Sequence, residues 1–188
     1  LASGADVAAA LADRHDVVLA TILPDGSWSI PGVTEPVSEA AGLDALRADD
    51  AVFPVLHGGW GEDGGLQREL DARRIAYVGC GAQASATGMS KIATSGAAAR
   101  RGVATIPTRV LHRSRYFADP DLLVGALARV ADWPLIVKPN TGGSSVGVHV
   151  VRSGARLRAA LDDAFSLDDT VLLQPLVSGA EVSVGVWS

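Results

Sequence analysis

The segment that most constrains the fold is an apolar run that leads directly into a glycine-rich loop and then a helical pattern. Residues Ala51–Leu56 have the composition of a buried strand. Five of the next nine residues, His57–Gly65, are glycines, and a helix is predicted from Leu66 to Arg74. This order of strand, loop and helix is typical of α/β folds, in which glycines let the backbone approach a ligand closely.

The rest of residues 1–88 continues this alternation of strands and helices. The patterns predict a helix over Gly4–Arg14, a strand over Asp16–Ile22, a turn at Pro24–Ser27, a helix over Ala40–Arg47, a strand over Ile75–Val78 and a helix after Gly81. Such alternation favours an open parallel α/β sheet, and ligands bind such sheets at the carboxyl ends of the strands.

The pattern changes near residue 88. The later segments predict a helix over Ser90–Arg101, an extended stretch over Val103–Leu111, a helix over Pro120–Ala131, strands over Leu135–Lys138 and Val146–Val151, a helix over Ala155–Phe165, a strand over Thr170–Gln174 and a final strand from Glu181. A strand, tight loop and strand indicate a hairpin, so this part is predicted to be α+β with antiparallel pairing. We therefore expect two domains, residues 1–88 and 89–188.

Composition and charge narrow the function classes. The chain has 188 residues, 48% hydrophobic and 20% charged, which is enough to bury a core. Lys and Arg number 16 against 21 Asp and Glu, and the net charge of -5 does not favour nucleic acid or an anionic membrane as partner. An anion that binds here must be held locally.

Cysteine usage and the two ends add expectations about location and completeness. The single cysteine, Cys80, excludes an internal disulfide, and the sequence shows no zinc spacing, signal peptide or membrane span. These features predict a soluble cytoplasmic protein. The chain begins at Leu1, and the alternation over Glu181–Ser188 indicates a strand that stops with its edge unpaired, so we expect a piece of a longer chain.

The loop with the clearest chemistry is Gly142–Gly147, which follows Lys138. Consecutive small residues in a turn can direct several backbone N–H groups at one anion, and the hydroxyls of Ser144 and Ser145 add donors. The loop is not a Walker A motif, because its lysine comes before the loop and a strand follows it. The sequence predicts a phosphate site on a hairpin, with an ordinary solvated hairpin loop as the alternative.

A hydrolase interpretation of the same residues fails on context. Gly143, Ser145 and Gly147 spell G-x-S-x-G, the nucleophile elbow of the α/β-hydrolases. An elbow needs a helix after the serine, followed by an acid and then a histidine. His149 is the only histidine after Ser145, and no acidic residue lies between the two.

A dinucleotide-binding interpretation of Gly79–Ala84 is also weak. These residues spell G-x-G-x-x-A between a strand and a helix. The fingerprint also needs an acid, or an arginine for NADP, at the end of a strand about 20 residues later. Arg100 and Arg101 have that spacing but lie at the end of a predicted helix.

Four segments are more informative together than any one alone: VFPVLHGGWGEDGGLQ, YVGCGAQASATGMSK, PLIVKPNTGGSSVGV and VLLQPLVSGAEV. Their order and spacing resemble the D-alanine:D-alanine ligases of the ATP-grasp superfamily over nearly the whole chain. The resemblance implies an open parallel α/β domain of the pre-ATP-grasp type, followed by the first part of an α+β ATP-grasp domain. It also implies ATP-dependent joining of two D-alanines through an acyl phosphate, for peptidoglycan precursor synthesis.

The resemblance implies roles for residues on ATP phosphates and on the first substrate. Lys91 and Lys138 match two lysines that contact ATP phosphates. The loop that closes over the phosphates is matched by Gly143, Ser144, Ser145 and Gly147. Ser144 also matches a serine near the first substrate, and His57 matches a histidine of the substrate pocket.

The resemblance also implies a site for the nucleoside. Gln174, Pro175 and Val177 lie in the match to the linker that reads adenine through backbone groups. Glu181 matches the acid that bonds the ribose hydroxyls.

Several positions depart from the family pattern. Gln174 and Pro175 replace the usual Glu and Lys of the linker, which leaves backbone recognition of adenine possible in principle. Gly142 replaces a polar residue that helps orient the substrate histidine, and this weakens the assignment of His57. Ser90 replaces the commoner Asp, and Gly65 replaces a Thr.

The resemblance further implies Mg²⁺ as a cofactor, but none of its ligands within this chain. The acids and the Asn that hold two magnesium ions, and an arginine of the oxyanion site, are expected beyond Ser188. A glutamate that binds the first D-alanine is expected before Leu1. The implied partners are ATP and D-alanine, with a homodimer as one assembly that the family allows.

Three functions stay open at this point. The leading hypothesis is a D-alanine:D-alanine ligase, for which these residues alone are expected to be inactive. A ligase that makes D-alanyl-D-lactate or D-alanyl-D-serine differs in a loop outside this sequence. A nucleotide-binding fragment or degenerate ligase without turnover is the alternative from another class.

Overall fold

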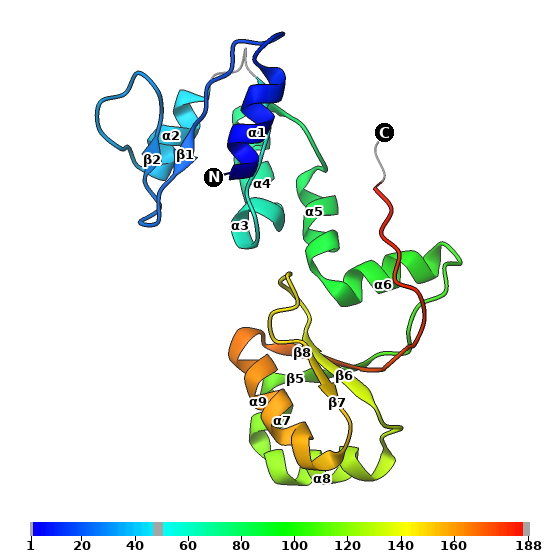
Figure 1. The fold of residues 1–188 in the computed structure, drawn as a ribbon. Coiled ribbons are helices and arrows are strands. Elements are labelled where there is room, and N and C mark those ends of the chain that lie inside the picture. The colour runs from blue at the N-terminus through cyan, green and yellow to red at the C-terminus, as the bar shows by residue number, and fades with distance from the viewer. Residues whose placement is uncertain (1, 47–50, 186–188) are drawn as a thin grey trace. The chain divides into compact units, whose positions relative to one another are not determined.

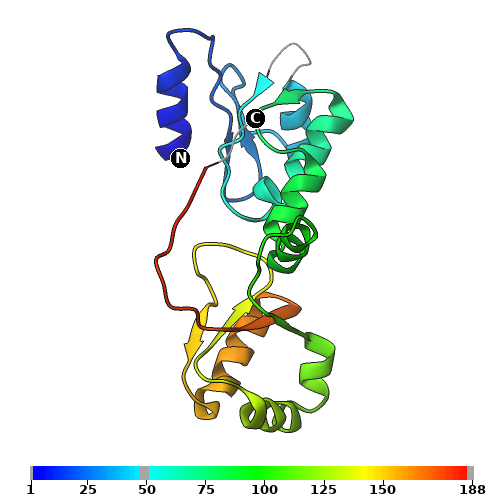
Figure 2. The ribbon, with the colours of Figure 1, turned by 90° about the vertical axis from the view of Figure 1, so that its right-hand side faces the viewer.

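The computed structural model describes residues 2–46 and 51–185, which form two compact units, Leu1–Met89 and Ser90–Ser188. The division falls next to the boundary expected near residue 88. Figures 1 and 2 show each unit as a mixture of helices and short strands. No described helix is both long and apolar enough to cross a membrane.

The first unit contains five helices and two small pairs of strands within its described residues. In chain order they are α1 (Ala2–Leu11), β1 (Thr21–Ile22), β2 (Trp28–Ser29), α2 (Glu39–Ala45), β3 (Ala51–Val52), α3 (Gly59–Glu62), α4 (Gly65–Arg73), β4 (Ala76–Tyr77) and α5 (Ala82–Met89). The predicted helices are present, but Arg47, the last residue expected in α2, lies outside the described residues.

The paired strands of this unit are shorter than the sequence predicts. Strands β1 and β2 pair antiparallel across the predicted turn, and β3 and β4 pair parallel. Parallel pairing is therefore confirmed for β3 and β4. Each expected strand of this unit is paired over only two residues, Thr21–Ile22, Ala51–Val52 and Ala76–Tyr77. A buried cluster packs beside them: Trp28, Leu43, Leu66, Leu70 and Ile75.

The glycine-rich loop after β3 serves internal packing at Gly65. A methyl group at Gly65 would lie 2.3 Å from Cδ1 of Trp60, whose side chain packs against the core of this unit. This close approach explains why a residue without a side chain stands at the position where the family usually carries a threonine. The approach is to the protein's own indole, whereas the sequence led us to expect an approach to a ligand.

Replacing Gly65 by alanine is expected to destabilise the first unit by about 1–2 kcal/mol, because overlap with the Trp60 ring outweighs the small gain of alanine in a helix. Gly88→Ala is the matched control, since a Cβ there meets nothing within 4 Å. Hydrogen exchange of α4 amides in the full-length protein measures the difference. Equal exchange in the two variants would show that Trp60 moves aside without cost.

The second unit is built around one four-stranded sheet. Its elements are α6 (Lys91–Arg100), β5 (Arg109–His112), α7 (Arg113–Ala118), α8 (Pro120–Val130), β6 (Leu135–Pro139), β7 (His149–Val151), the 3-10 helix η1 (Gly154–Arg156), α9 (Leu157–Leu167) and β8 (Thr170–Pro175). The strands run in the order β5-β8-β6-β7, and every neighbouring pair is antiparallel. The antiparallel α+β arrangement is therefore confirmed.

Helix α9 packs on one face of this sheet, and α7 and α8 lie beside it (Figure 1). The core between sheet and helices is fully buried at Val137 of β6, Val171 of β8 and Phe165 of α9. Because strand side chains alternate between faces, Ile136, Lys138 and their neighbours lie on the opposite face. Lys138 therefore lies on the face of the sheet opposite α9.

The structure differs from the sequence analysis of this unit in two places, a helix that was not predicted and a predicted strand that is wrong. Helix α7 was not expected, and it forms because Tyr116 is fully buried against Phe165, a long-range contact that local pattern does not reveal. The expected final strand is absent over Glu181–Gly185, where Val182 and Val184 are each 79% exposed. Alternating residues form a strand only when another strand pairs with them, and none of the described strands does. Val186–Ser188 lie outside the described residues.

Candidate functional site

The loop between β6 and β7 adopts a conformation that is unusual for its residues. Ser144 and Ser145 have φ of 50° and 58°, and the N–H of Val146 donates to the carbonyl of Gly143 over 3.1 Å. Positive φ at both central residues is the signature of a type I′ turn, which joins antiparallel strands well. Residues other than glycine, asparagine and aspartate rarely adopt a positive φ. Strained backbone conformations of this kind are concentrated at functional sites.

The same turn leaves a set of backbone donors available. The N–H groups of Gly143, Ser144 and Ser145 donate to no acceptor in the described parts of the chain. These residues are exposed, so their amides and hydroxyls are accessible from solvent. Several unpaired N–H donors on consecutive residues can bind one anion together.

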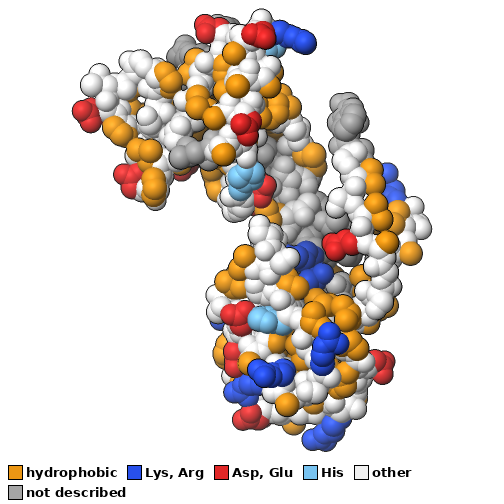
Figure 3. All heavy atoms as spheres, viewed as in Figure 1, with side chains coloured by type: hydrophobic (Ala, Val, Ile, Leu, Met, Phe, Trp, Pro, Cys, Tyr) orange, Lys and Arg blue, Asp and Glu red, His pale blue; other side chains and the backbone are white. Residues whose placement is uncertain are grey.

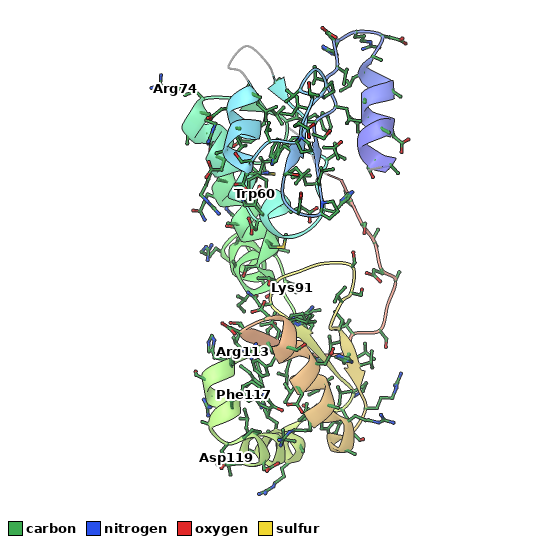
Figure 4. All side chains as sticks on the ribbon, turned by 90° about the vertical axis from the view of Figure 1, so that its left-hand side faces the viewer. Trp60, Arg74, Lys91, Arg113, Phe117 and Asp119 are labelled. Atoms are coloured by element: carbon green, nitrogen blue, oxygen red, sulfur yellow. The ribbon has the colours of Figure 1, made fainter. Side chains whose placement is uncertain are left out.

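Lys91, at the first position of α6, reaches the base of this loop (Figure 4). Its Nζ donates to the carbonyl oxygens of Thr141 (2.9 Å), Gly142 (3.0 Å) and Asn140 (3.4 Å). The backbone N–H of Lys91 donates to the Asn140 carbonyl over 3.0 Å, and Ser90 exchanges hydrogen bonds with the Asn140 side chain. The start of α6 is thereby tied to the end of β6.

Ser90 also forms the N-cap at the start of α6. Its hydroxyl accepts a hydrogen bond from the N–H of Ala93 over 3.3 Å, which caps the helix. Aspartate, commoner at this position in the family, is an equally good cap, so this departure keeps the local structure. Capping fixes where Lys91 leaves the helix.

Lys138, in β6, supplies a second ammonium group on the face opposite α9. Its backbone lies opposite Leu172 of β8. Its ammonium makes no hydrogen bond or ion pair with the described residues, although the side chain is half-buried. A half-buried cation without a partner is a natural site for an anionic ligand. Figure 3 shows Lys and Arg side chains at the end of this unit that carries the β6–β7 loop, and others elsewhere on its surface.

The two lysines influence each other electrostatically. Burial lowers the pKa of Lys91, and the neighbouring charge of Lys138 lowers it further, while the charge of Asp168 acts in the opposite direction. Burial likewise lowers the pKa of Lys138. Two cations brought together in a partly buried place repel each other until an anion joins them. The electrostatics therefore favour a multiply charged anion, such as a polyphosphate.

The predicted adenine linker lies at the end of β8. Gln174 is buried, and its side-chain Nε2 donates to the Thr108 hydroxyl over 2.7 Å, so this amide is used within the protein. Pro175 ends the strand, and the N–H and carbonyl of Val177 make no hydrogen bond with the described residues. Backbone groups at Val177 are thus available to a ligand, whereas the Gln174 side chain is not.

Two further predicted site residues, Glu181 and His57, are exposed. Glu181 lies in the exposed segment after β8 that has no regular structure. His57 belongs to the first unit, where it is exposed and precedes the short helix α3; the next residue's N–H donates to Glu62 Oε2 over 2.6 Å. Lys91, Lys138, Ser144 and Ser145 all belong to the second unit.

Comparison with known proteins agrees with this organisation. A model of the D-ala D-ala ligase N-terminus matches residues 31–80, and a model of the D-ala D-ala ligase C-terminus matches residues 98–188. A D-alanine–D-alanine ligase of Chlorobaculum tepidum is 38% identical over 178 residues. The chain belongs to the D-alanine–D-alanine ligase family.

Other relatives give the same result. A D-alanine–D-alanine ligase of Chlorobium limicola is 44% identical over 137 residues, and the crystal structure of D-alanine–D-alanine ligase from Helicobacter pylori matches with a TM-score of 0.61 at 28% identity. The matches cover 91%, 73% and 92% of this chain and 49%, 38% and 47% of the Chlorobaculum, Chlorobium and Helicobacter proteins. The chain thus spans about half the length of its relatives, or less.

Family membership confirms the expected fold, an α/β part followed by the first part of an ATP-grasp domain. The roles assigned to individual residues stay predictions. Asn140, Thr141 and Asp168 were not predicted as parts of the site, although they hold the loop and Lys91 in place. Their sequence context, a strand end and a helix end, looks like ordinary turns.

Gly147, at the end of the loop, is predicted to tolerate no side chain. Its φ is +70°, and a Cβ there would lie 2.4 Å from Cδ1 of Leu167 and 3.2 Å from Cδ of Pro139. Gly147→Ala should destabilise the β6–β7 hairpin by about 1–2 kcal/mol, the cost of a left-handed conformation for alanine. Hydrogen exchange of β7 amides tests this against Gly125→Ala in α8, where the nearest atom is 3.9 Å away. Unchanged exchange in Gly147→Ala would contradict the prediction.

Proposed function

We propose that the full-length protein is an ADP-forming ligase that uses ATP to join two D-alanines into D-alanyl-D-alanine, for peptidoglycan synthesis. The observation that carries the proposal is the loop of unpaired amides beside two lysines, of which Lys138 has no partner in the described chain. This constellation suits a polyphosphate, and its loop and Lys138 lie in the part of the chain matched by the ligase C-terminal model, residues 98–188.

In this proposal the second unit holds ATP. Lys138 and Lys91 neutralise phosphate charge, and the amides of Gly143, Ser144 and Ser145 donate to phosphate oxygens, with Gly147 allowing the loop its shape. The residues present fit the group, because the Lys138 ammonium and the amides of Gly143, Ser144 and Ser145 are donors without partners among the described residues.

The nucleoside is proposed to lie beyond the end of β8. Adenine would bind the backbone at Pro175 and Val177, with Gln174 acting only through its position in the strand. Glu181 would accept hydrogen bonds from the ribose hydroxyls.

Substrate binding is the second part of the proposal. His57 is assigned to the pocket of the first D-alanine, and Ser144 is assigned both to the phosphate loop and to this substrate. The D-alanine carboxylate attacks the γ-phosphorus of ATP and displaces ADP, which forms an acyl phosphate. The amine of the second D-alanine then attacks the acyl carbon, and inorganic phosphate leaves. Positioning and charge neutralisation are what the protein supplies to such a transfer.

Magnesium is proposed as a cofactor of the full-length protein without ligands among the residues described here. No group of three or more His, Cys, Asp or Glu side chains within the described residues is arranged to hold a metal ion. The residues present do not fit Mg²⁺, and no step is assigned to it. A cytoplasmic location and a homodimer follow only from the family assignment and belong to the same proposal.

Phosphate release by the full-length protein, with ATP, Mg²⁺ and D-alanine, tests the function. The proposal predicts release that depends on D-alanine and yields one D-alanyl-D-alanine for each ATP. The assay is repeated with D-lactate or D-serine beside D-alanine. Preferential formation of a mixed product would replace the proposal with the corresponding variant ligase, and no release with any substrate would favour a nucleotide-binding protein without turnover.

A further inference from the structure

Asp168 stands between helix α9 and strand β8, and its two carboxylate oxygens have different partners. Oδ2 accepts hydrogen bonds from the backbone N–H and the hydroxyl of Thr141, over 2.8 and 2.6 Å. Oδ1 accepts from the N–H of Thr170 over 2.8 Å. Asp168 therefore joins the first residue of β8 to the beginning of the β6–β7 loop.

Thr141 is held from two sides by opposite charges. Its N–H and hydroxyl face the carboxylate of Asp168, and its carbonyl accepts a hydrogen bond from Lys91 Nζ over 2.9 Å. Both backbone groups of this residue are thus in charge-assisted hydrogen bonds, which are about twice as strong as neutral ones. The base of the loop is fixed, while the turn at Ser144 and Ser145 beyond it stays accessible.

Asp168 also balances the charge of Lys91. Its negative charge raises the pKa of Lys91, against burial and the charge of Lys138, which lower it. Burial raises the pKa of Asp168, but hydrogen bonds from Thr141 and Thr170 and the charge of Lys91 outweigh burial and leave that pKa below its usual value. Asp168 is therefore ionised at neutral pH, and it favours the ammonium form of Lys91.

We propose that Asp168 is the positioning residue of the phosphate site: its carboxylate anchors the base of the β6–β7 loop through Thr141 and serves as counter-charge to the Lys91 ammonium. The inference rests on the proposed function for its nucleotide, but the anchoring contacts involve only residues of this chain. Asp168 itself is not proposed to contact phosphate, because its carboxylate and the phosphate would repel each other.

Asp168→Asn in the full-length protein tests the proposal. An asparagine side chain keeps the size but has only one oxygen, so the Thr141 and Thr170 donors cannot all be satisfied, and the counter-charge is lost. ATP binding is expected to weaken about tenfold, on the scale of a lost charge-assisted contact. Without ligand, the amides of residues 141–145 should exchange faster.

The pH dependence of ATP binding distinguishes a positioning role from a merely structural one. Because the Asp168 charge raises the pKa of Lys91, its removal lowers that pKa, and the ammonium is lost at lower pH. The alkaline fall in ATP affinity should therefore shift to lower pH in Asp168→Asn. The control is Asp169→Asn, since the Asp169 side chain is 83% exposed and pairs with Arg113 instead of Thr141.

Thr141→Val is a second variant that keeps the backbone contact and removes only the hydroxyl, so ATP binding should weaken less and keep its pH dependence.

The proposal is overturned if Asp168→Asn is folded and matches Asp169→Asn in loop exchange, ATP affinity and pH profile. Faster loop exchange with unchanged ATP affinity also overturns it. Failure of the unmodified protein to bind ATP would instead refute the proposed function, and the inference that rests on it.

Discussion

Replacing Phe165 by alanine is expected to destabilise the second unit by about 3–5 kcal/mol, the usual cost of removing a fully buried aromatic side chain. Phe165 has no exposed surface, and its ring stacks on Tyr116 with centroids 4.7 Å apart. The loss is large because Phe165 lies between the sheet and α7, so no neighbour can fill the cavity without moving an element of the core.

The effect should extend to helix α7. Tyr116 donates a hydrogen bond to Asp162, and burial raises the pKa of its hydroxyl, so the tyrosine stays neutral at ordinary pH. Arg113 donates to the carbonyl of Phe165, a backbone contact that alanine keeps. Without the Phe165 ring, however, the buried face of Tyr116 loses its stacking partner.

Hydrogen exchange of α9 and β6 amides in the full-length protein measures this destabilisation. Leu122→Ala is the matched control, because Leu122 is a helical residue with 69% of its surface exposed, and its replacement should cost less than about 0.5 kcal/mol. A Phe165→Ala protein as protected as the control would show that the core of this unit is not packed as described.

Replacing Lys138 by alanine is expected to weaken ATP binding by about 2–3 kcal/mol, which is roughly 30- to 150-fold in Kd. The physical reason is that the Lys138 ammonium is half-buried without a partner among the described residues, so its charge is available to phosphate. Isothermal titration of the full-length protein with ATP gives the dissociation constants.

Two further variants help to interpret the effect of Lys138→Ala. Lys138→Met keeps the length of the side chain without its charge; because burial lowers the pKa of Lys138, folding disfavours the ammonium, and this variant should be at least as stable as the unmodified protein. Arg152→Ala removes one exposed charge elsewhere and should leave Kd unchanged. Unaltered ATP affinity in both Lys138 variants would assign this lysine a structural role.

Local signals predicted the boundaries of helices α6 and α8 well. Asp119 and Pro120 form an N-cap and first helical position, and α8 begins there, with the Asp119 carboxylate accepting from Leu122 N–H over 2.9 Å. Ser90 caps α6 in the same way, and Gly102 follows its end. These signals are contained in a few adjacent residues, which is why sequence reveals them.

Long-range features were harder to predict. An apolar run such as Ala51–Leu56 indicates burial, but only Ala51 and Val52 pair with another strand, because pairing depends on a distant partner and Pro54 lacks an N–H. Helix α7 depends on Tyr116 meeting Phe165, which lies far along the chain. The alternation after Glu181 indicates a strand only if a partner is assumed.

The sequence predicted the hydrogen-bond donors of the candidate site, but it did not reveal the residues that hold them in place. The small residues of Gly142–Gly147 and the lysine before them indicated an anion site, and resemblance supplied Lys91. Asp168 gave no signal, because an aspartate that follows the C-terminal end of a helix is usually a solvated turn residue. Its role depends on Thr141, which is 27 residues away and adjacent only in the fold.

We propose that the second unit holds the phosphates of ATP. The most direct measurement is a crystal structure of the full-length protein with a non-hydrolysable ATP analogue and Mg²⁺. Phosphate oxygens are expected within hydrogen-bond distance of Lys138 Nζ and of the Ser144 and Ser145 amides. A bound nucleotide whose phosphates touch none of these groups would contradict it.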